Sequence, residues 1–301
     1  MDEFRYRAPA RSFLGEEAWA VGSAQDARAI VIPFPLEATV SFGQGTSGGP
    51  DAIIAASDAL EAFDEELGFS PIRSFGLATL ETAMIARPLE AALDQIENLA
   101  GAALSREGFP LILGGEHSLT IGALRAFAAR HGELAVLHFD AHADLRDSYR
   151  GGRFSHACVM RRVLEHQHLN LVSVGVRSIS QSEMAFLNAR SDRISVHWAR
   201  DRAAWDVSEI VRPLAGKPIY LSFDVDAFDA SLMPATGTPE PGGLFFDDAC
   251  AIIRAAAEAG PIVGADLVEL APIPGMTACD VTAAKLAYKI LSYALGREAV
   301  S

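Results

Sequence analysis

The sequence predicts a single α/β domain over residues 1–301, with three α/β/α layers around a central, mostly parallel sheet. Two patterns support this fold class. Short apolar runs with strand-like composition alternate along the chain with segments of helical spacing, which is typical of a parallel sheet covered by helices. The runs are apolar at successive positions, so their strands should be buried on both faces. The chain contains no internal repeat, low-complexity tract or linker that would separate a second domain.

The expected elements follow one another along the chain. Strands are expected at 29–34, 110–115, 134–140, 170–178, 218–226 and 261–270, and helices at 87–108, 118–132, 246–260 and 277–298. The helix over 87–108 repeats apolar residues at helical spacing, beginning with Leu89 and Leu93, and its pattern stops at a glycine. The last helix begins with the spacing of a capping box, at Thr277 and Asp280.

Composition favours a soluble cytoplasmic protein. Half of the residues are hydrophobic, which supports a substantial core, and the formal net charge is −14. Such an acidic surface disfavours binding to nucleic acid or to an anionic membrane and tolerates cationic ligands. The three cysteines form no CxxC motif, which fits a reducing compartment. No apolar run reaches the roughly 18–20 residues of a membrane span, and no signal peptide is expected because residues 1–13 lack an apolar stretch.

Four of the expected strands end in ionisable residues or are directly followed by them. These residues are His117, then Asp140, His142 and Asp144, then Asp224 and Asp226, and finally Glu269. Because ligands of parallel sheets bind beyond the carboxyl ends of the strands, we expect these side chains to meet at one edge. Buried carboxylates without a compensating cation cost several kcal/mol each. The sequence therefore predicts a cation site at this edge of the sheet.

The ligand inventory predicts two metal ions. It consists of four carboxylates and two imidazoles, from Asp140, Asp144, Asp224, Asp226, His117 and His142. This set is too large for one catalytic ion and suits two ions if some carboxylates bridge. Oxygen ligands with some imidazole and no thiolate favour Mn²⁺ over Zn²⁺, Fe²⁺ or Co²⁺. Such ions would lower the pKa of a bound water and provide a hydroxide nucleophile.

Six motifs together resemble the ureohydrolases, the family of arginase, agmatinase and their relatives. In chain order they read GGEHS, DAHADLRD, SHACVMRR, SFDVDAFD, ATGTPEPGG and DLVEL. The resemblance runs from about Gly45 to the C-terminal helix, and it implies an arginase-like fold with two Mn²⁺ ions per chain. It also implies the metal ligands: His117 and Asp144 for one ion, His142 and Asp226 for the other, and Asp140 and Asp224 as bridges.

The resemblance further implies the catalytic and substrate-binding residues. Asp144 would pass a proton to the leaving amine, and His156 would shuttle protons in the substrate channel. Glu269 would pair with the guanidinium of the substrate, with Thr238 beside it. Hydroxide attack on the guanidino carbon would then give a tetrahedral intermediate that collapses to urea and an amine.

Agmatine, a small cationic guanidino compound, is the favoured substrate, with putrescine and urea as products. The Glu240–Pro241 pair resembles agmatinase, and the segment after DAHAD lacks the Asn- and Ser-containing loop of arginases. Arg146 or Arg150 could instead read a carboxylate, so guanidinobutyrate and other guanidino acids stay open. Arginine and formimidoylglutamate are less favoured substrates.

Other kinds of protein fit single features of the chain. A metal-binding homologue without activity would need only the ligands, and a dinuclear phosphatase would need basic residues beside them. The segment GQGTSGG at 43–49 has the GxGxxG pattern of dinucleotide sites, but it does not directly follow the strand at 29–34. The resemblance to ureohydrolases also implies assembly into a homotrimer or homohexamer.

Overall fold

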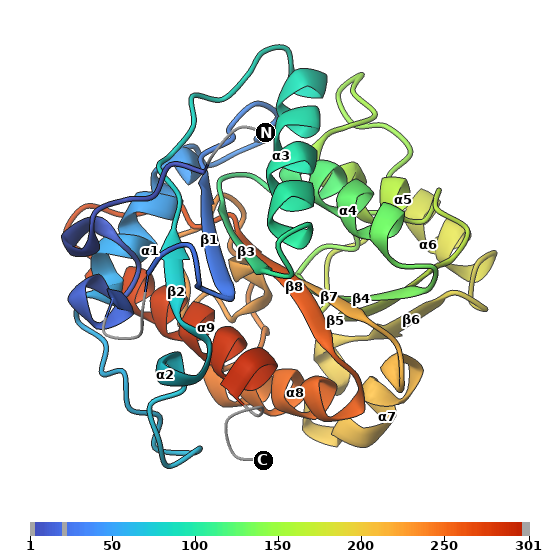
Figure 1. The fold of residues 1–301 in the computed structure, drawn as a ribbon. Helices are drawn as coiled ribbons and strands as arrows, with labels where there is room; N and C mark the ends of the chain where they lie inside the picture. Colours follow the sequence, from blue (N-terminus) through green and yellow to red (C-terminus); the bar gives the residue numbers. More distant parts are fainter. Residues whose placement is uncertain (1–3, 20–22, 297–301) are drawn as a thin grey trace.

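A computed structural model describes residues 4–19 and 23–296, and its centre is one sheet of eight parallel strands (Figure 1). The strands lie in the order β2-β1-β3-β8-β7-β4-β5-β6. Their bounds are β1 Ala29–Phe34, β2 Leu77–Thr79, β3 Phe109–Gly114, β4 Leu134–Phe139, β5 Leu169–Val174, β6 Ile194–His197, β7 Ile219–Asp224 and β8 Ile262–Val268. The predicted α/β class with a parallel sheet is confirmed.

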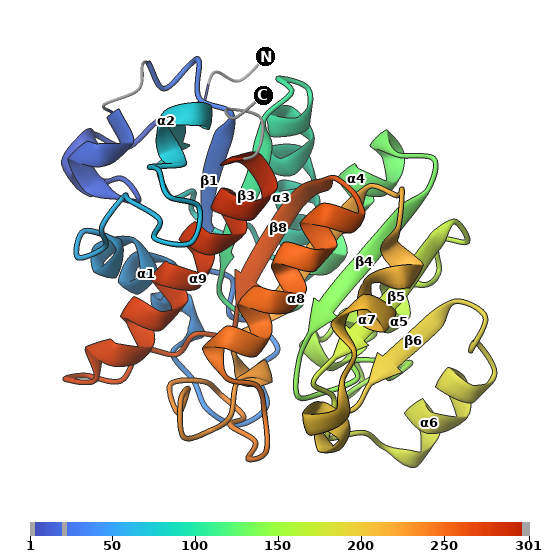
Figure 2. The same ribbon diagram turned by 90° about the horizontal axis from the view of Figure 1, so that it is seen from below.

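Helices cover both faces of the sheet, which makes three layers (Figures 1 and 2). One face carries α3 Leu89–Leu104, α4 Leu119–Arg130, α5 Val159–Val163 and α6 Gln181–Asn188. The other face carries α1 Gly49–Ser57, α2 Ile72–Phe75, α7 Val207–Val211, α8 Phe246–Ala259 and α9 Thr277–Leu295. Each helical layer closes its own hydrophobic core against the sheet.

Neighbouring strands pair so that side chains of one face stay together. Val31 of β1 pairs with Leu111 of β3, and both belong to the core under α9. The next pair, Ile32 and Ile112, belongs to the opposite core under α3 and α4. Because successive side chains of a strand point to opposite faces, apolar residues are needed at both, and this explains the continuous apolar runs.

The structure differs from the sequence-based expectation at the sheet edges and at helix ends. Strands β2 and β6 were not expected; both are short, and both form edges of the sheet. Helix α3 ends at Leu104, before the glycine stop. The predicted capping box is wrong, because Met276 is the N-cap residue of α9 and no side chain caps it. In the part of the chain that the structure describes, no helix is long and apolar enough to cross a membrane.

Candidate active site

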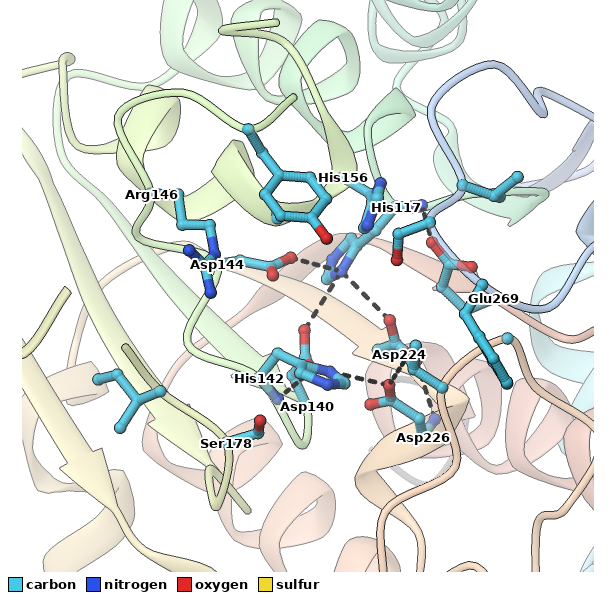
Figure 3. Close-up of a pocket in the computed structure, with 18 of the residues that line it drawn as sticks. His117, Asp140, His142, Asp144, Arg146, His156, Ser178, Asp224, Asp226 and Glu269 are labelled. Atoms are coloured by element: carbon cyan, nitrogen blue, oxygen red, sulfur yellow. Dashed lines mark hydrogen bonds and ion pairs between the residues drawn. The ribbon is translucent and has the colours of Figure 1, made fainter. Parts of the chain in front are cut away.

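The four central strands, β3, β8, β7 and β4, deliver the predicted site residues to one pocket (Figure 3). His117 lies between β3 and α4, and Glu269 directly follows β8. Asp140, His142 and Asp144 follow β4, Asp224 ends β7, and Asp226 lies two residues after it. The pocket is lined by every residue predicted for the site: His117, Asp140, His142, Asp144, His156, Asp224, Asp226, Thr238 and Glu269.

His117 faces three carboxylates. Its Nδ1 atom lies 3.2 Å from Asp144 Oδ2, 3.3 Å from Asp140 Oδ2 and 3.4 Å from Asp224 Oδ2. Nδ1 is buried and has no hydrogen-bond partner among the described residues. A buried ring nitrogen that faces three carboxylate oxygens has the arrangement of a metal ligand set.

The other ring nitrogen of His117 defines the tautomer of the neutral imidazole. Nε2 lies 2.9 Å from the hydroxyl oxygen of Ser222, and this hydroxyl donates to Asp266 Oδ1 at 2.7 Å. Since the hydroxyl proton of Ser222 is used on Asp266, Ser222 accepts the proton of Nε2. The Nδ1 lone pair of His117 is therefore free for a metal ion, and Asp266 orients the ligand through Ser222.

His142 forms the second half of the cluster. Its Nδ1 atom lies 3.0 Å from Asp226 Oδ2 and 3.3 Å from Asp140 Oδ1. Asp140 thus faces His142 with one oxygen and His117 with the other, which is the geometry of a bridging carboxylate. Asp224 presents Oδ2 to His117, while its Oδ1 accepts the backbone N–H of Asp226 at 2.8 Å.

The carboxylates of the cluster are buried and repel one another, so a positive charge among them would stabilise their ionised forms. Burial, reinforced by repulsion from Asp226 and Asp140, raises the pKa of Asp224 well above its usual range. Burial and then the charge of Asp140 also raise the pKa of Asp144. Burial opposes ionisation of His117, but the favourable interaction of a charged ring with Asp140, Asp144 and Asp224 outweighs it and raises the pKa of His117. Divalent cations would relieve the repulsion, so the donor set fits a metal centre.

Two site carboxylates stand on strained backbone. Asp144 has φ 52° and Glu269 has φ 66°, a left-handed conformation that costs about 1 kcal/mol or more for residues with a side chain. Glu269 is held there by bonds from both ends, because its N–H donates to Gly115 and its Oε1 accepts the backbone N–H of His117 at 2.7 Å. Burial raises the pKa of Glu269 to about 8. A bound cation beside Glu269 would favour its ionised form.

Two loops meet at the wall of the pocket. The N–H of Gly43 donates to the carbonyl of Gly237 at 3.1 Å, and a Cβ on Gly43 would lie 2.8 Å from the Cα of Gly237. Only glycine allows this approach. The neighbouring Thr238 donates to Asp226 Oδ2 at 3.2 Å, so its hydroxyl is directed to the metal cluster. The GQGTSGG segment thus supplies part of the pocket wall and then begins α1.

Of the two arginines considered for substrate recognition, Arg146 lines the pocket. Its Nε atom lies 3.8 Å from Glu183 Oε2, and its guanidinium lies 5.2 Å from the centre of the Tyr149 ring. Arg150 lies 5.5 Å from the same ring and is not among the residues that line the pocket. The positive charge of Arg146 is therefore partly balanced by a buried carboxylate.

Several contributing residues were missed from the sequence. His138 Nε2 lies 2.9 Å from Asp140 Oδ2, and its Nδ1 lies 3.1 Å from Ser173 Oγ. A histidine inside an otherwise apolar strand was the signal for it. Ser222 lies in the motif SFDVDAFD, but nothing in the sequence indicated that its hydroxyl contacts His117.

The chain is similar to known proteins over nearly its whole length. Residues 27–293 match the sequence model of the Arginase family. The chain is 37% identical to the N(1)-aminopropylagmatine ureohydrolase of Synechocystis sp., over 96% of this chain and 95% of that protein. It is 32% identical to the guanidinobutyrase of Pseudomonas aeruginosa, over 87% and 85%. The crystal structure of the agmatine ureohydrolase of Thermoplasma volcanium superposes with a TM-score of 0.83 at 30% identity, covering 93% of this chain and 94% of that chain.

Proposed function

Since the chain belongs to the arginase family and is a ureohydrolase acting on a C–N bond of a guanidino compound, we propose that it hydrolyses agmatine to putrescine and urea with two Mn²⁺ ions. One observation is the main support for a substrate with a guanidino group. The carboxylate of Glu269 is buried in the pocket that holds the histidine and aspartate ligands, and its Oε1 accepts the backbone N–H of His117. A guanidinium seated against Glu269 would have its carbon above the metal cluster.

The charge of the pocket supports a cationic tail over a carboxylate tail. Apart from the histidines, Arg146 is the only basic residue among those that line the pocket, and Glu183 already lies beside it. A guanidino acid would have to compete with Glu183 for this arginine. The net charge of −14 also favours the approach of a dication.

A longer polyamine is the second candidate substrate. The relative from Synechocystis, similar over nearly the whole chain, is named for N(1)-aminopropylagmatine, which extends agmatine by an aminopropyl group. Guanidinobutyrate is the third candidate substrate, since the chain is also similar to a guanidinobutyrase. These three compounds share the guanidino group and differ in the tail.

In this proposal the residues of the chain have separate tasks. When bound, the metal ions supply Lewis acidity that makes water a nucleophile near neutral pH. Glu269 pairs with the guanidinium and orients its carbon. Asp144 carries a proton to the departing nitrogen, and His156 moves protons between solvent and the pocket.

A panel of substrates tests the proposal. Purified protein loaded with Mn²⁺ is assayed for urea release from agmatine, N(1)-aminopropylagmatine, guanidinobutyrate, arginine and formimidoylglutamate, and for phosphate release from a generic phosphomonoester. We expect kcat/KM to be largest for agmatine. A larger kcat/KM for another guanidino compound would make that compound the preferred substrate. Metal binding without urea release would indicate a homologue without activity, and phosphate release alone would overturn the guanidino chemistry.

A further inference from the structure

A chain of hydrogen bonds connects the buried residue Glu116 to the ring of His156 through Thr39. The hydroxyl of Thr39 lies 2.7 Å from Glu116 Oε1 and 3.0 Å from His156 Nδ1. The backbone N–H of His156 also donates to this hydroxyl at 3.0 Å. Thr39 comes from the loop after β1, whereas His156 begins the short 3₁₀ helix His156–Cys158 before α5, so the contacts join segments 117 residues apart.

Glu116 is fully buried and is surrounded by hydrogen-bond donors. Its Oε2 accepts the backbone N–H groups of Ala38 at 2.6 Å and Thr39 at 2.5 Å. Its Oε1 accepts the hydroxyls of Thr39 and Ser118. An ionised carboxylate can only accept, and these four groups can all donate to it.

The direction of each hydrogen bond follows from this inventory. The hydroxyl of Thr39 has one proton, and that proton is used on Glu116. Its lone pairs are then left for His156, so the bond to Nδ1 requires a proton on Nδ1. In the neutral ring Nε2 is consequently the unprotonated atom. Ser155 Oγ is too distant, at 3.5 Å from Nδ1, to define the tautomer instead.

We propose that Thr39 and Glu116 are positioning residues that hold His156 as the Nδ1–H tautomer, with Nε2 left as the ring atom that gains and loses the proton in the pocket. The inference deepens the proposed function and rests on it for the role of His156, which lines the same pocket as Asp144 (Figure 3). Nε2 accepts a proton from solvent and releases the same proton inside the pocket. The other proton stays on Nδ1 throughout, in its hydrogen bond to the Thr39 hydroxyl oxygen.

The tautomer itself is the first readout, because it does not depend on activity. Full-length protein with ¹⁵N-labelled histidine is examined by NMR at a pH where the ring is neutral, both without added metal and loaded with diamagnetic Zn²⁺. The His156 signals are assigned among the eight histidines of the chain by their loss in His156→Gln. We expect a protonated Nδ1 and a bare Nε2. A neutral ring with its proton on Nε2 in the wild type would overturn the inference.

Two variants should change the tautomer in a defined way. Thr39→Val keeps the volume but removes the acceptor, so the ring should return to the Nε2–H form that free imidazoles prefer. Glu116→Gln places an amide donor beside Thr39, whose hydroxyl can then donate to Nδ1 and also favour Nε2–H. Thr39→Ser keeps the hydroxyl and should keep the wild-type tautomer. An unchanged tautomer in both Thr39→Val and Glu116→Gln would contradict the inference.

Kinetics of urea release separate positioning from folding and from the proposed function. For Thr39→Val we expect kcat to fall about tenfold or more with KM and metal content nearly unchanged, since a misdirected general acid–base loses part of its contribution. Thr39→Ser should restore kcat to within about threefold of wild type. A changed tautomer with unchanged kcat would overturn the positioning role. If the wild type has the expected tautomer but releases urea from no guanidino compound, the proposed function fails and the hydrogen-bond assignment stands.

Discussion

The imidazole of His117 and the carboxylate of Asp266 are joined through a single hydroxyl group, that of Ser222. The two bonds measure 2.9 Å and 2.7 Å and place the ring proton on Nε2. Asp266 is fully buried and also accepts the hydroxyls of Thr120 and Tyr220. It is therefore a fixed acceptor that keeps Nδ1 of His117 on the side of the three carboxylates, where a cation could bind between them.

Ser222→Ala should weaken metal binding at His117. Loss of such an orienting partner typically costs about 10–100-fold in metal affinity. The measurement is a titration of metal-free protein with Mn²⁺. Thr120→Val is the matched control, because it removes another hydrogen bond to Asp266 without touching His117. Equal affinities in Ser222→Ala and wild type would show that the hydroxyl does not orient the ligand.

The metal centre should hold two ions per chain. His117 and His142 face different sets of carboxylates and share Asp140, so each histidine defines its own position. Elemental analysis after reconstitution with Mn²⁺ should approach two equivalents per chain. A folded, saturated protein that never exceeds one equivalent would contradict the dinuclear assignment.

Asp140→Ala and Asp224→Ala should lose metal together with activity. Each removes a carboxylate that faces His117, and Asp140 also faces His142. Metal content and urea release are measured on the same preparation. Asp201→Ala, at an exposed position away from the pocket, is the control and should behave as wild type. Either site variant with full metal content and normal turnover would place the bridging role elsewhere.

Glu269→Gln should lower kcat/KM about a hundredfold, close to 3 kcal/mol, because a charge-assisted bond to the guanidinium becomes a neutral one. The amide oxygen of glutamine can still accept the backbone N–H of His117, so both metal ions should stay bound. Activity within a few-fold of wild type, with metal retained, would make Glu269 a structural residue. Loss of metal would make it part of the ligand support.

Asp229→Asn should lower stability at neutral pH and leave it unchanged in strong acid. Hydrogen bonds from Ser231, followed by those from Gly242 and Gly243, lower the pKa of Asp229 to about 2. A lowered pKa stabilises the fold above the unfolded value of about 3.9, and this stabilisation is lost as the pH falls from there toward 2. After allowance for solvent screening we expect about 1 kcal/mol. Urea denaturation at pH 7 and pH 2 measures the difference, and a constant difference at both would contradict it.

Sequence patterns predicted the central strands well because burial on both faces leaves a continuous apolar signature. The edge strands lack it: β2 has three residues, and β6 is only partly buried. Helix α6 was also missed, although Ser180 and Glu183 form a capping box at its start. Thr277 and Asp280 have the same spacing and equally suitable side chains, yet they form no capping box. Local spacing therefore does not determine which candidate cap forms; the packing of the helix does.

The sequence could predict which candidate ligands line the pocket because parallel strands bring their carboxyl ends to one edge. Glu116 and Thr39 could not be assigned in this way. Their contact with His156 depends on how the loop after β1 folds over the sheet, and no periodicity encodes it. The same holds for Ser222, whose partners His117 and Asp266 come from two other segments.

The position of β8 determines when the candidate metal ligands can come together during synthesis. This strand is the last of the sheet to leave the ribosome, yet it lies between β3 and β7. Before it arrives, the earlier strands can form only two separate half-sheets, with His117 on one and Asp140 on the other. Closing this gap requires contacts distant in sequence, which form slowly. A nascent or truncated chain that stops before residue 262 contains all six proposed metal donors, but it should not bring His117 together with the aspartates, however well its halves have folded.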